Sequence, residues 1–265
     1  MTPYKAMLSR SALVGAALCV VALACGDVPT LEGGIAFISA VILPSPAVAF
    51  GDTLRNEAGV VAPLRVFAID NNGDTIQSVQ PTFIVTTVPG PSVTILPNDF
   101  ARGDSVRTAS IVARIGTRLQ TPPAQLNVVF QPDSMAAGSP TTASFPVANT
   151  GEITSSVPLS VNVTSIGGGT RAGVPSIIVR YLITAIYPLG KPVADTSVVL
   201  VDDQNRFIPP SGNFSVDTTD ASGNASRRIR AVPFGFDSVA ILVSANNLKG
   251  IPLPGGPIRF VVSTK

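Results

Sequence analysis

The sequence predicts an all-β protein made of two tandem β-sandwiches that follow a cleaved signal segment. Three observations lead to this fold class. Charged residues make up only 13% of the chain. The 23 glycines and 24 prolines separate runs rich in β-branched side chains, a mixture that favours strands joined by tight turns. No window after residue 24 has a convincing helical period.

The N-terminal segment predicts export from the cell. Lys5 and Arg10 give a positively charged start, and Ser11–Ala24 is short, apolar and rich in small residues. This is the pattern of a signal peptide, assigned here to residues 1–24. The apolar run is shorter than the roughly 20 residues that a membrane-spanning helix needs, so a spanning helix is not expected here.

The end of this segment, Ala22-Leu23-Ala24-Cys25-Gly26, resembles the lipobox of bacterial lipoproteins, with Ala22 where leucine is commoner. The resemblance implies that Cys25 carries a lipid and anchors the protein to the membrane, at the outer membrane or cell surface. The same residues also fit ordinary signal peptidase, and the alternative is a secreted protein with a free Cys25. Cys19 lies inside the signal segment, so the mature chain cannot form an internal disulfide.

Residues 25–34 are predicted to be a flexible tether, and residues 35–148 to form the first sandwich. Asn72-Gly73 is a strong turn signal, because this pair adopts positive φ easily. A polar break begins at Asn149, and 149–156 is predicted to be a linker. The expected strands of the first sandwich are 36–43, 64–69, 83–87, 92–96, 105–115, 126–130 and 142–147.

The second sandwich is predicted to span residues 157–265. Its first strand alternates apolar and polar residues from Val157 to Thr164, and Pro158 predicts an edge position for it. Further strands are expected at 176–187, 197–202, 213–217, 225–231, 238–245 and 257–263. Seven strands in about 110 residues is the count and size of an immunoglobulin-like sandwich.

Two turns in this half match a known family. They are Gly190-Lys191-Pro192-Val193 and Thr219-Asp220-Ala221-Ser222-Gly223-Asn224-Ala225. They resemble the turns of the bacterial Ig-like domain of the invasin and intimin type (Big-1), over roughly residues 157–265. The first half is similar only in its strand order. The resemblance implies a structural, stalk-like or adhesive role at a bacterial surface, and no chemistry.

The side-chain inventory argues against catalysis and against a cofactor. The chain has no histidine, which is the commonest general base and metal ligand. It also lacks a Gly-x-Ser-x-Gly elbow and a phosphate-binding glycine loop. Without the signal segment the net charge is close to zero and no basic stripe stands out, so no nucleic-acid partner is expected.

Two acidic clusters could offer oxygen ligands to calcium, but neither has the EF-hand spacing, and capping of their own turns is the favoured interpretation. The clusters are Asp70, Asn72, Asp74 and Asp202, Asp203, Asp217, Asp220. Arg102-Gly103-Asp104 spells the tripeptide that integrins recognise. Without a presenting loop this match is a weak signal.

A contact tip is predicted at the outer end of the second sandwich. Counting strand reversals from Val157 places the loops 165–175, 203–212 and 232–237 there, and the turn 219–224 at the end that faces the first sandwich. Phe207, Phe234 and Phe236 lie in two of the outer loops. They either form an exposed apolar contact patch or fold inward and close the core.

The predicted function is that of a lipid-anchored, exported bacterial protein with a structural or adhesive role at the cell envelope or surface. The alternatives are a ligand- or glycan-binding module and a subunit of a periplasmic or outer-membrane assembly. The expected partners are the membrane, through the N-terminal lipid, and a protein or glycan at the cell surface. The protein would be secreted if Cys25 is not acylated.

Overall fold

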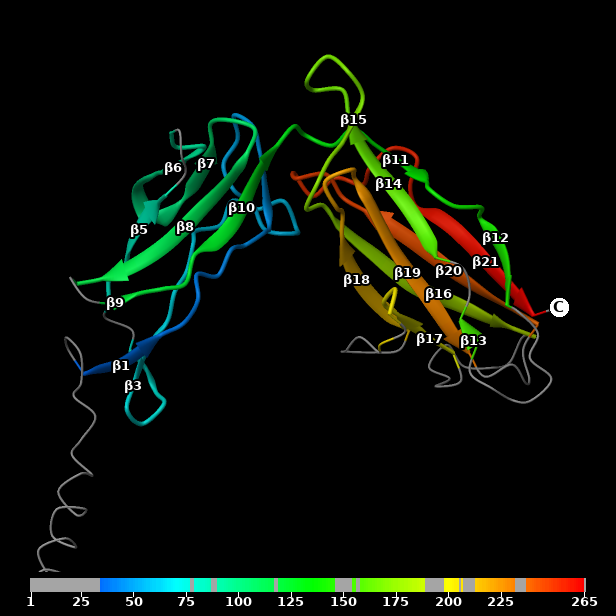
Figure 1. The fold of residues 1–265 in the computed structure, drawn as a ribbon, viewed down its shortest axis with the longest axis horizontal. Helices are drawn as coiled ribbons and strands as arrows, with labels where there is room; N and C mark the ends of the chain where they lie inside the picture. Colours follow the sequence, from blue (N-terminus) through cyan, green and yellow to red (C-terminus); the bar gives the residue numbers. More distant parts are fainter. Residues whose placement is uncertain are drawn as a thin grey trace, which may run out of the picture.

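The computed structural model describes residues 34–76, 79–86, 90–116, 119–145, 154–155, 158–188, 198–204, 206, 213–231 and 237–264. Within these residues the regular elements are strands, apart from one short 3-10 turn at Pro97–Asp99, and loops connect them. The strands gather in two lobes, each a β-sandwich, with β1–β10 in the first and β11–β21 in the second (Figure 1). The predicted fold class of two tandem sandwiches is confirmed.

The first sandwich is built from short strands around Leu54, Ile111 and Leu126, which are fully buried. One sheet has the order β1-β3-β4 and another has the order β2-β10-β8-β5, with β9 added to β8, while β6 and β7 form a separate pair. The bounds are β1 Ile35–Ile38, β2 Ala47–Ala49, β3 Ala68–Asp70, β4 Thr75–Ile76, β5 Thr82–Val85, β6 Val93–Ile95, β7 Ala101–Gly103, β8 Thr108–Ile115, β9 Leu119–Gln120 and β10 Ala124–Val129.

The second sandwich has longer strands and two clear layers. One layer has the order β11-β14-β19, with β13, β15 and β17 on its margins, and the other has the order β12-β21-β20-β16-β18. Tyr181, Ile229 and Phe260 are fully buried between the layers. The bounds are β11 Ser134–Ala137, β12 Thr142–Phe145, β13 Thr154–Ser155, β14 Leu159–Ser165, β15 Ala172–Gly173, β16 Ile178–Tyr187, β17 Val198–Val201, β18 Phe214–Thr218, β19 Asn224–Ala231, β20 Ser238–Ala245 and β21 Ile258–Thr264.

The strand pairings place the boundary between the sandwiches earlier in the chain than predicted. β11 pairs antiparallel with β14, and β12 pairs parallel with β21, so residues 134–145 belong to the second sandwich. The chain crosses between the lobes at residues 130–133, and the predicted division into 35–148, a linker at 149–156 and 157–265 is wrong. The polar break at Asn149 falls within the span of the second sandwich, because two of its strands precede that break.

The predicted edge position of the strand after Pro158 is also wrong. β14 lies between β11 and β19 and pairs with both. Pro158 itself lies between β13 and β14, which both pair with β19. The interruption at Pro158 means that the sheet needs no hydrogen-bond donor from this residue, which reconciles the proline with an interior strand.

Candidate functional site at the junction of the sandwiches

The residues singled out from the sequence as a lipid site and a contact tip lie outside the described residues. These are Cys25, Phe207, Phe234 and Phe236. The ends of the loop that carries Phe234 and Phe236 are described. Asp237 donates its backbone N–H to Tyr187, and Thr264 donates to Asp237, at the end of the second sandwich remote from the first (Figure 1).

One loop predicted for that outer end lies at the opposite end. In loop 165–175, Gly167 and Gly168 pass over the ring of Phe130, the first residue of the crossing. The error follows from the boundary. β11 already runs outward from the crossing, and β14, which is antiparallel to it, runs back toward the junction, whereas the count treated the strand from Val157 as the first outward one. The turn 219–224 lies at the junction end as predicted, because Ser176 donates to Thr219 and Ser176 also contacts Asn127 of the first sandwich.

The loops that meet at the junction carry two turns of the same construction. In the first sandwich the side-chain oxygen of Asn56 accepts the N–H groups of Ala58 and Val60. In the second sandwich the side-chain oxygen of Asn247 accepts the N–H groups of Lys249 and Ile251 in the same way. Each turn is an Asn-x-x-Gly sequence followed by a β-branched residue. This repeated motif is a local signal for the junction that lies outside the predicted sites.

The glycines of these twin turns allow the two backbones to touch. Gly59 has φ +79°, and a Cβ there would lie 2.1 Å from the carbonyl oxygen of Lys249. Gly250 has φ +77°, and a Cβ there would lie 2.5 Å from the carbonyl oxygen of Ala58. No side chain other than hydrogen fits either position, since both the conformation and the contact require glycine.

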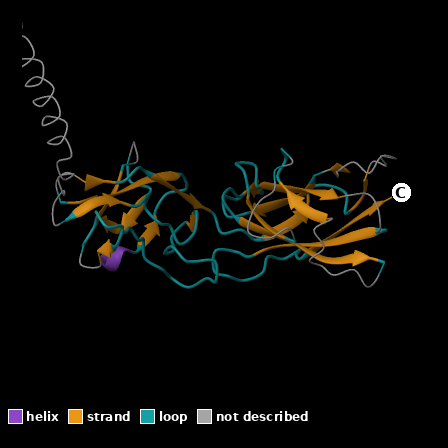
Figure 2. Cartoon of the chain, turned by 90° about the horizontal axis from the view of Figure 1, so that it is seen from below, coloured by secondary structure: helices purple, strands orange, loops and turns teal. Residues whose placement is uncertain are grey.

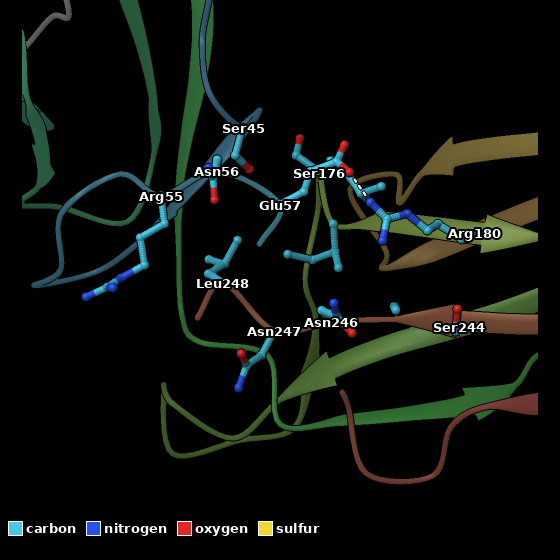
Figure 3. Close-up of a pocket in the computed structure, with 13 residues that line it drawn as sticks. Ser45, Arg55, Asn56, Glu57, Ser176, Arg180, Ser244, Asn246, Asn247 and Leu248 are labelled. Carbon is cyan, nitrogen blue, oxygen red and sulfur yellow. Dashed lines mark hydrogen bonds and ion pairs between the residues drawn. The ribbon is translucent and has the colours of Figure 1, made fainter. Parts of the chain in front are cut away.

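Polar side chains add specific contacts around the twin turns. Arg180 on β16 forms an ion pair with Glu57 of the first sandwich (Figure 3). The Asn127 amide on β10 donates to the Ser176 hydroxyl at 2.6 Å. Both ionic side chains are partly exposed, so the pair orients the two lobes more than it stabilises them.

Apolar packing continues across the junction. Ala47 on β2 and Val129 on β10 belong to the first sandwich, yet they are buried in the same cluster as Val174 and Ile177 of the second. Phe130 also packs edge-on against Phe50, with ring centroids 6.1 Å apart. Continuous burial and turn-to-turn contact together make the junction a packed interface.

Two hollows flank this interface. The smaller lies between Arg55–Glu57 and Ser244–Leu248, and Figure 3 shows side chains from both sandwiches around it. The larger is a mainly apolar groove of about 430 Å³ between Val106–Thr108, Asn127–Phe130 and the loop 165–175. Its polar groups include Arg107, Asn127 and Thr170.

The two acidic clusters considered for calcium contribute to turns like those at the junction. Asp70 accepts the N–H groups of Asn72 and Asp74, and Asp220 accepts those of Ser222 and Asn224. Asp202 caps its own turn likewise, and the backbone hydrogen bond from Arg206 is the main cause that lowers its pKa. No group of three or more potential metal-binding acidic or cysteine side chains occurs among the described residues.

The integrin-like tripeptide is tied into the first sandwich. Arg102 donates to Asp104 at 2.8 Å, and Gly103 is buried on β7. Burial raises the pKa of the Asp104 carboxyl, but hydrogen bonds from Thr94 and Arg102 outweigh it and hold the pKa below its usual value. The charged ends of the tripeptide are therefore engaged with each other and with Thr94.

Comparison with known proteins gives remote structural neighbours. The adhesin InvE of Yersinia pseudotuberculosis has 16% identity and a TM-score of 0.31, and the match covers 89% of this chain and 61% of that one. Domains 5–6 of the S-layer protein SbsC have 12% identity and a TM-score of 0.27, with 85% and 96% covered. The Escherichia coli adhesin FdeC has 12% identity and a TM-score of 0.29, with 86% and 63% covered.

No protein-family model matches the sequence, and no curated protein matches it either. This chain spans about three fifths of the length of InvE, the first of the structural neighbours described above. In the part of the chain that the structure describes, no helix has the length and apolar character needed to cross a membrane.

Proposed function

We propose that the protein is a lipid-anchored structural module of a bacterial cell envelope, with two sandwiches that act as one stiff spacer. The turn-to-turn contact at the junction supports the stiff spacer, and the anchor rests on the sequence around Cys25. Tandem domains joined by a bare linker are expected to move relative to each other. Here Gly59 and Gly250 bring two backbones into contact, and Val129 shares a cluster with the second core, which favours a fixed orientation.

The lipid anchor is tested at Cys25. Cys25→Ser removes the sulfur that would be acylated, so the variant should move from the membrane to the soluble fraction. The measurement is fractionation of cells followed by detection of the protein in each fraction. Membrane association that is the same for the variant and the unchanged chain would remove the anchor from the proposal and leave a secreted protein.

An adhesive role is the second candidate, and Phe207, Phe234 and Phe236 at the predicted contact tip are its residues. The loop that carries Phe234 and Phe236 connects Ala231 to Asp237, and these two residues belong to the outer end of the second sandwich. A stiff spacer would hold such a tip away from the membrane. The partner would be a protein or a glycan of another surface.

Substitution of Phe207 and Phe234 by serine separates adhesion from packing. A contact tip predicts lost binding to cells with a nearly unchanged melting temperature. If the rings close the core instead, stability should fall by about 3–5 kcal/mol for each large-to-small change. The two measurements are cell binding and thermal unfolding, and the second pattern would exclude the tip as an adhesive site.

A further inference from the structure

Phe37, Phe67 and Ile69 form an apolar stripe on the outward face of the ribbon made by β1 and β3. Phe37 pairs with Ile69, and Ile38 pairs with the buried Ala68. Successive side chains of a strand point to opposite faces, so Phe67 and Ile69 lie on the face opposite to Ala68. The carbonyl of Phe67 accepts the N–H of Ser39, so Phe67 lies opposite Ser39, two positions along the ladder from the Phe37–Ile69 pair and on the same face.

Packing of the sandwich does not account for these two rings. The inner face of the ribbon already contributes Ile35 and Ala68 to a small core with Ile115. Phe37 is 53% exposed and Phe67 is 42% exposed. Two large aromatic side chains on one open face, in a chain with few charges, are the kind of surface that marks a contact site.

The position of the stripe indicates what covers it. β1 and β3 lie at the end of the first sandwich remote from the second (Figure 1). The described chain begins at Gly34, next to β1. The ten residues from Cys25 to Gly34 reach at most about 33–36 Å when extended. A bilayer that holds a lipid on Cys25 is therefore always within reach of Phe37.

We propose that Phe37 and Phe67 contact the lipid bilayer beside the anchor and dock the first sandwich on the membrane surface. This inference rests on the proposed lipid anchor at Cys25. Aromatic side chains bury readily at the boundary between head groups and acyl chains. A short tether keeps the local concentration of bilayer high, so a small apolar patch is enough for contact.

The absence of tryptophan from the chain makes the test direct. In Phe37→Trp the new side chain is the only tryptophan and reports its own environment. The mature chain is coupled through Cys25, its only cysteine, to a maleimide lipid in phosphatidylcholine vesicles. We expect the emission to shift to the blue and to be quenched by brominated lipid. Phe67→Trp is a second reporter in case the first variant folds poorly.

Leu182→Trp is the matched control, because Leu182 is an exposed apolar residue of β16 in the second sandwich. Its emission should not be quenched by brominated lipid. Equal, weak quenching of all three reporters would overturn the proposal. A blue shift of Phe37→Trp that grows with protein concentration without vesicles would also overturn it, since a second copy would then cover the stripe.

The chemical coupling keeps the two proposals separable. Because the lipid is attached to Cys25 chemically in vitro, tryptophan quenching reports bilayer contact whether or not a cell acylates Cys25. Failure of the anchor shows as unchanged fractionation of Cys25→Ser, while failure of the docking face shows as missing quenching at Phe37 and Phe67.

Discussion

At the scale of single residues, Arg227 joins the two layers of the second sandwich. It lies on β19 in one layer, and Asp217 lies on β18 in the other. The guanidinium is 3.0 Å from the Asp217 carboxylate, donates to the Ser215 hydroxyl at 3.0 Å, and donates to the carbonyl of Val216. Only 11% of the Arg227 side chain is exposed. The arginine thus closes an edge where the two sheets do not exchange backbone hydrogen bonds.

Arg227→Met should lower the free energy of unfolding by about 3 kcal/mol, because it leaves Asp217 partly buried without its partner. Urea unfolding measures the change. Arg206→Met is the control, since Arg206 also pairs with an aspartate, Asp202, but is 71% exposed. Exposed pairs contribute little, so the control should unfold like the unchanged chain. Similar losses in both variants would refute the bridging role of Arg227.

At the scale of elements, one turn design recurs in both sandwiches. An Asn or Asp side chain accepts two backbone N–H groups, and a glycine with positive φ stands three residues later. The examples at Asn56, Asp70, Asp220 and Asn247 share this pattern. The turn at Asp70 is open at its glycine, and the turn at Asp220 packs against Val163 and Gly173 of its own sandwich. Those at Asn56 and Asn247 pack against each other.

Gly59→Ala should therefore disturb the junction, while Gly73→Ala should not. Both glycines have positive φ, so each substitution costs about 1–2 kcal/mol in backbone strain. Only Gly59 has a neighbour in the way, since nothing lies within 4 Å of a Cβ at Gly73. Spin labels on cysteines at Gln125 and Arg259, in a Cys25→Ser background, would measure the distance between the sandwiches.

The expected result is a narrow distance distribution for the unchanged chain and Gly73→Ala, and a broad one for Gly59→Ala. A broad distribution in the unchanged chain would contradict the stiff spacer itself. A narrow one in all three proteins would mean that the contact between the twin turns does not set the orientation.

Particular strands show how much of this fold the local sequence pattern predicts. The alternation predicted from Val157 to Thr164 corresponds closely to β14 at Leu159–Ser165, and the strand predicted at 238–245 matches β20. The strand predicted at 142–147, which is β12, falls in the wrong sandwich, and β11 has no counterpart among the predicted strands. Their partners β21 and β14 are distant in the sequence, and such pairings leave no local signal. The junction was missed for the same reason, although both Asn-x-x-Gly motifs were present to be read.

At the scale of the whole molecule, the two sandwiches follow each other along one long axis. The described chain starts at β1 on one end and finishes with β21 at the other (Figure 2). The crossing at Phe130–Asp133 is short. The strands before and after it, β10 and β11, are each packed in their own sandwich. Fragments cut at the crossing and fragments cut at the polar break should therefore behave differently.

A fragment of residues 131–265 should fold cooperatively, whereas one of residues 157–265 should be much less stable. The shorter fragment lacks β11 and β12, so it exposes the edges of β14 and β21, and unpaired edges promote association. Thermal unfolding and size-exclusion chromatography of the two fragments would measure both effects. If the two fragments were equally stable, the boundary predicted from the sequence at residues 149–156 would be the correct one.

The parallel pairing of β12 with β21 bears on how the protein responds to mechanical load. Thr142–Phe145 runs in the same direction as Val261–Thr264. A pull across the chain drags β12 toward its start and β21 toward its end, in opposite directions along a shared ladder. The hydrogen bonds of that ladder are then strained together in shear instead of being opened one after another. A load applied between the chain before Thr142 and the end of β21 at Thr264 would therefore be carried by the whole ladder at once.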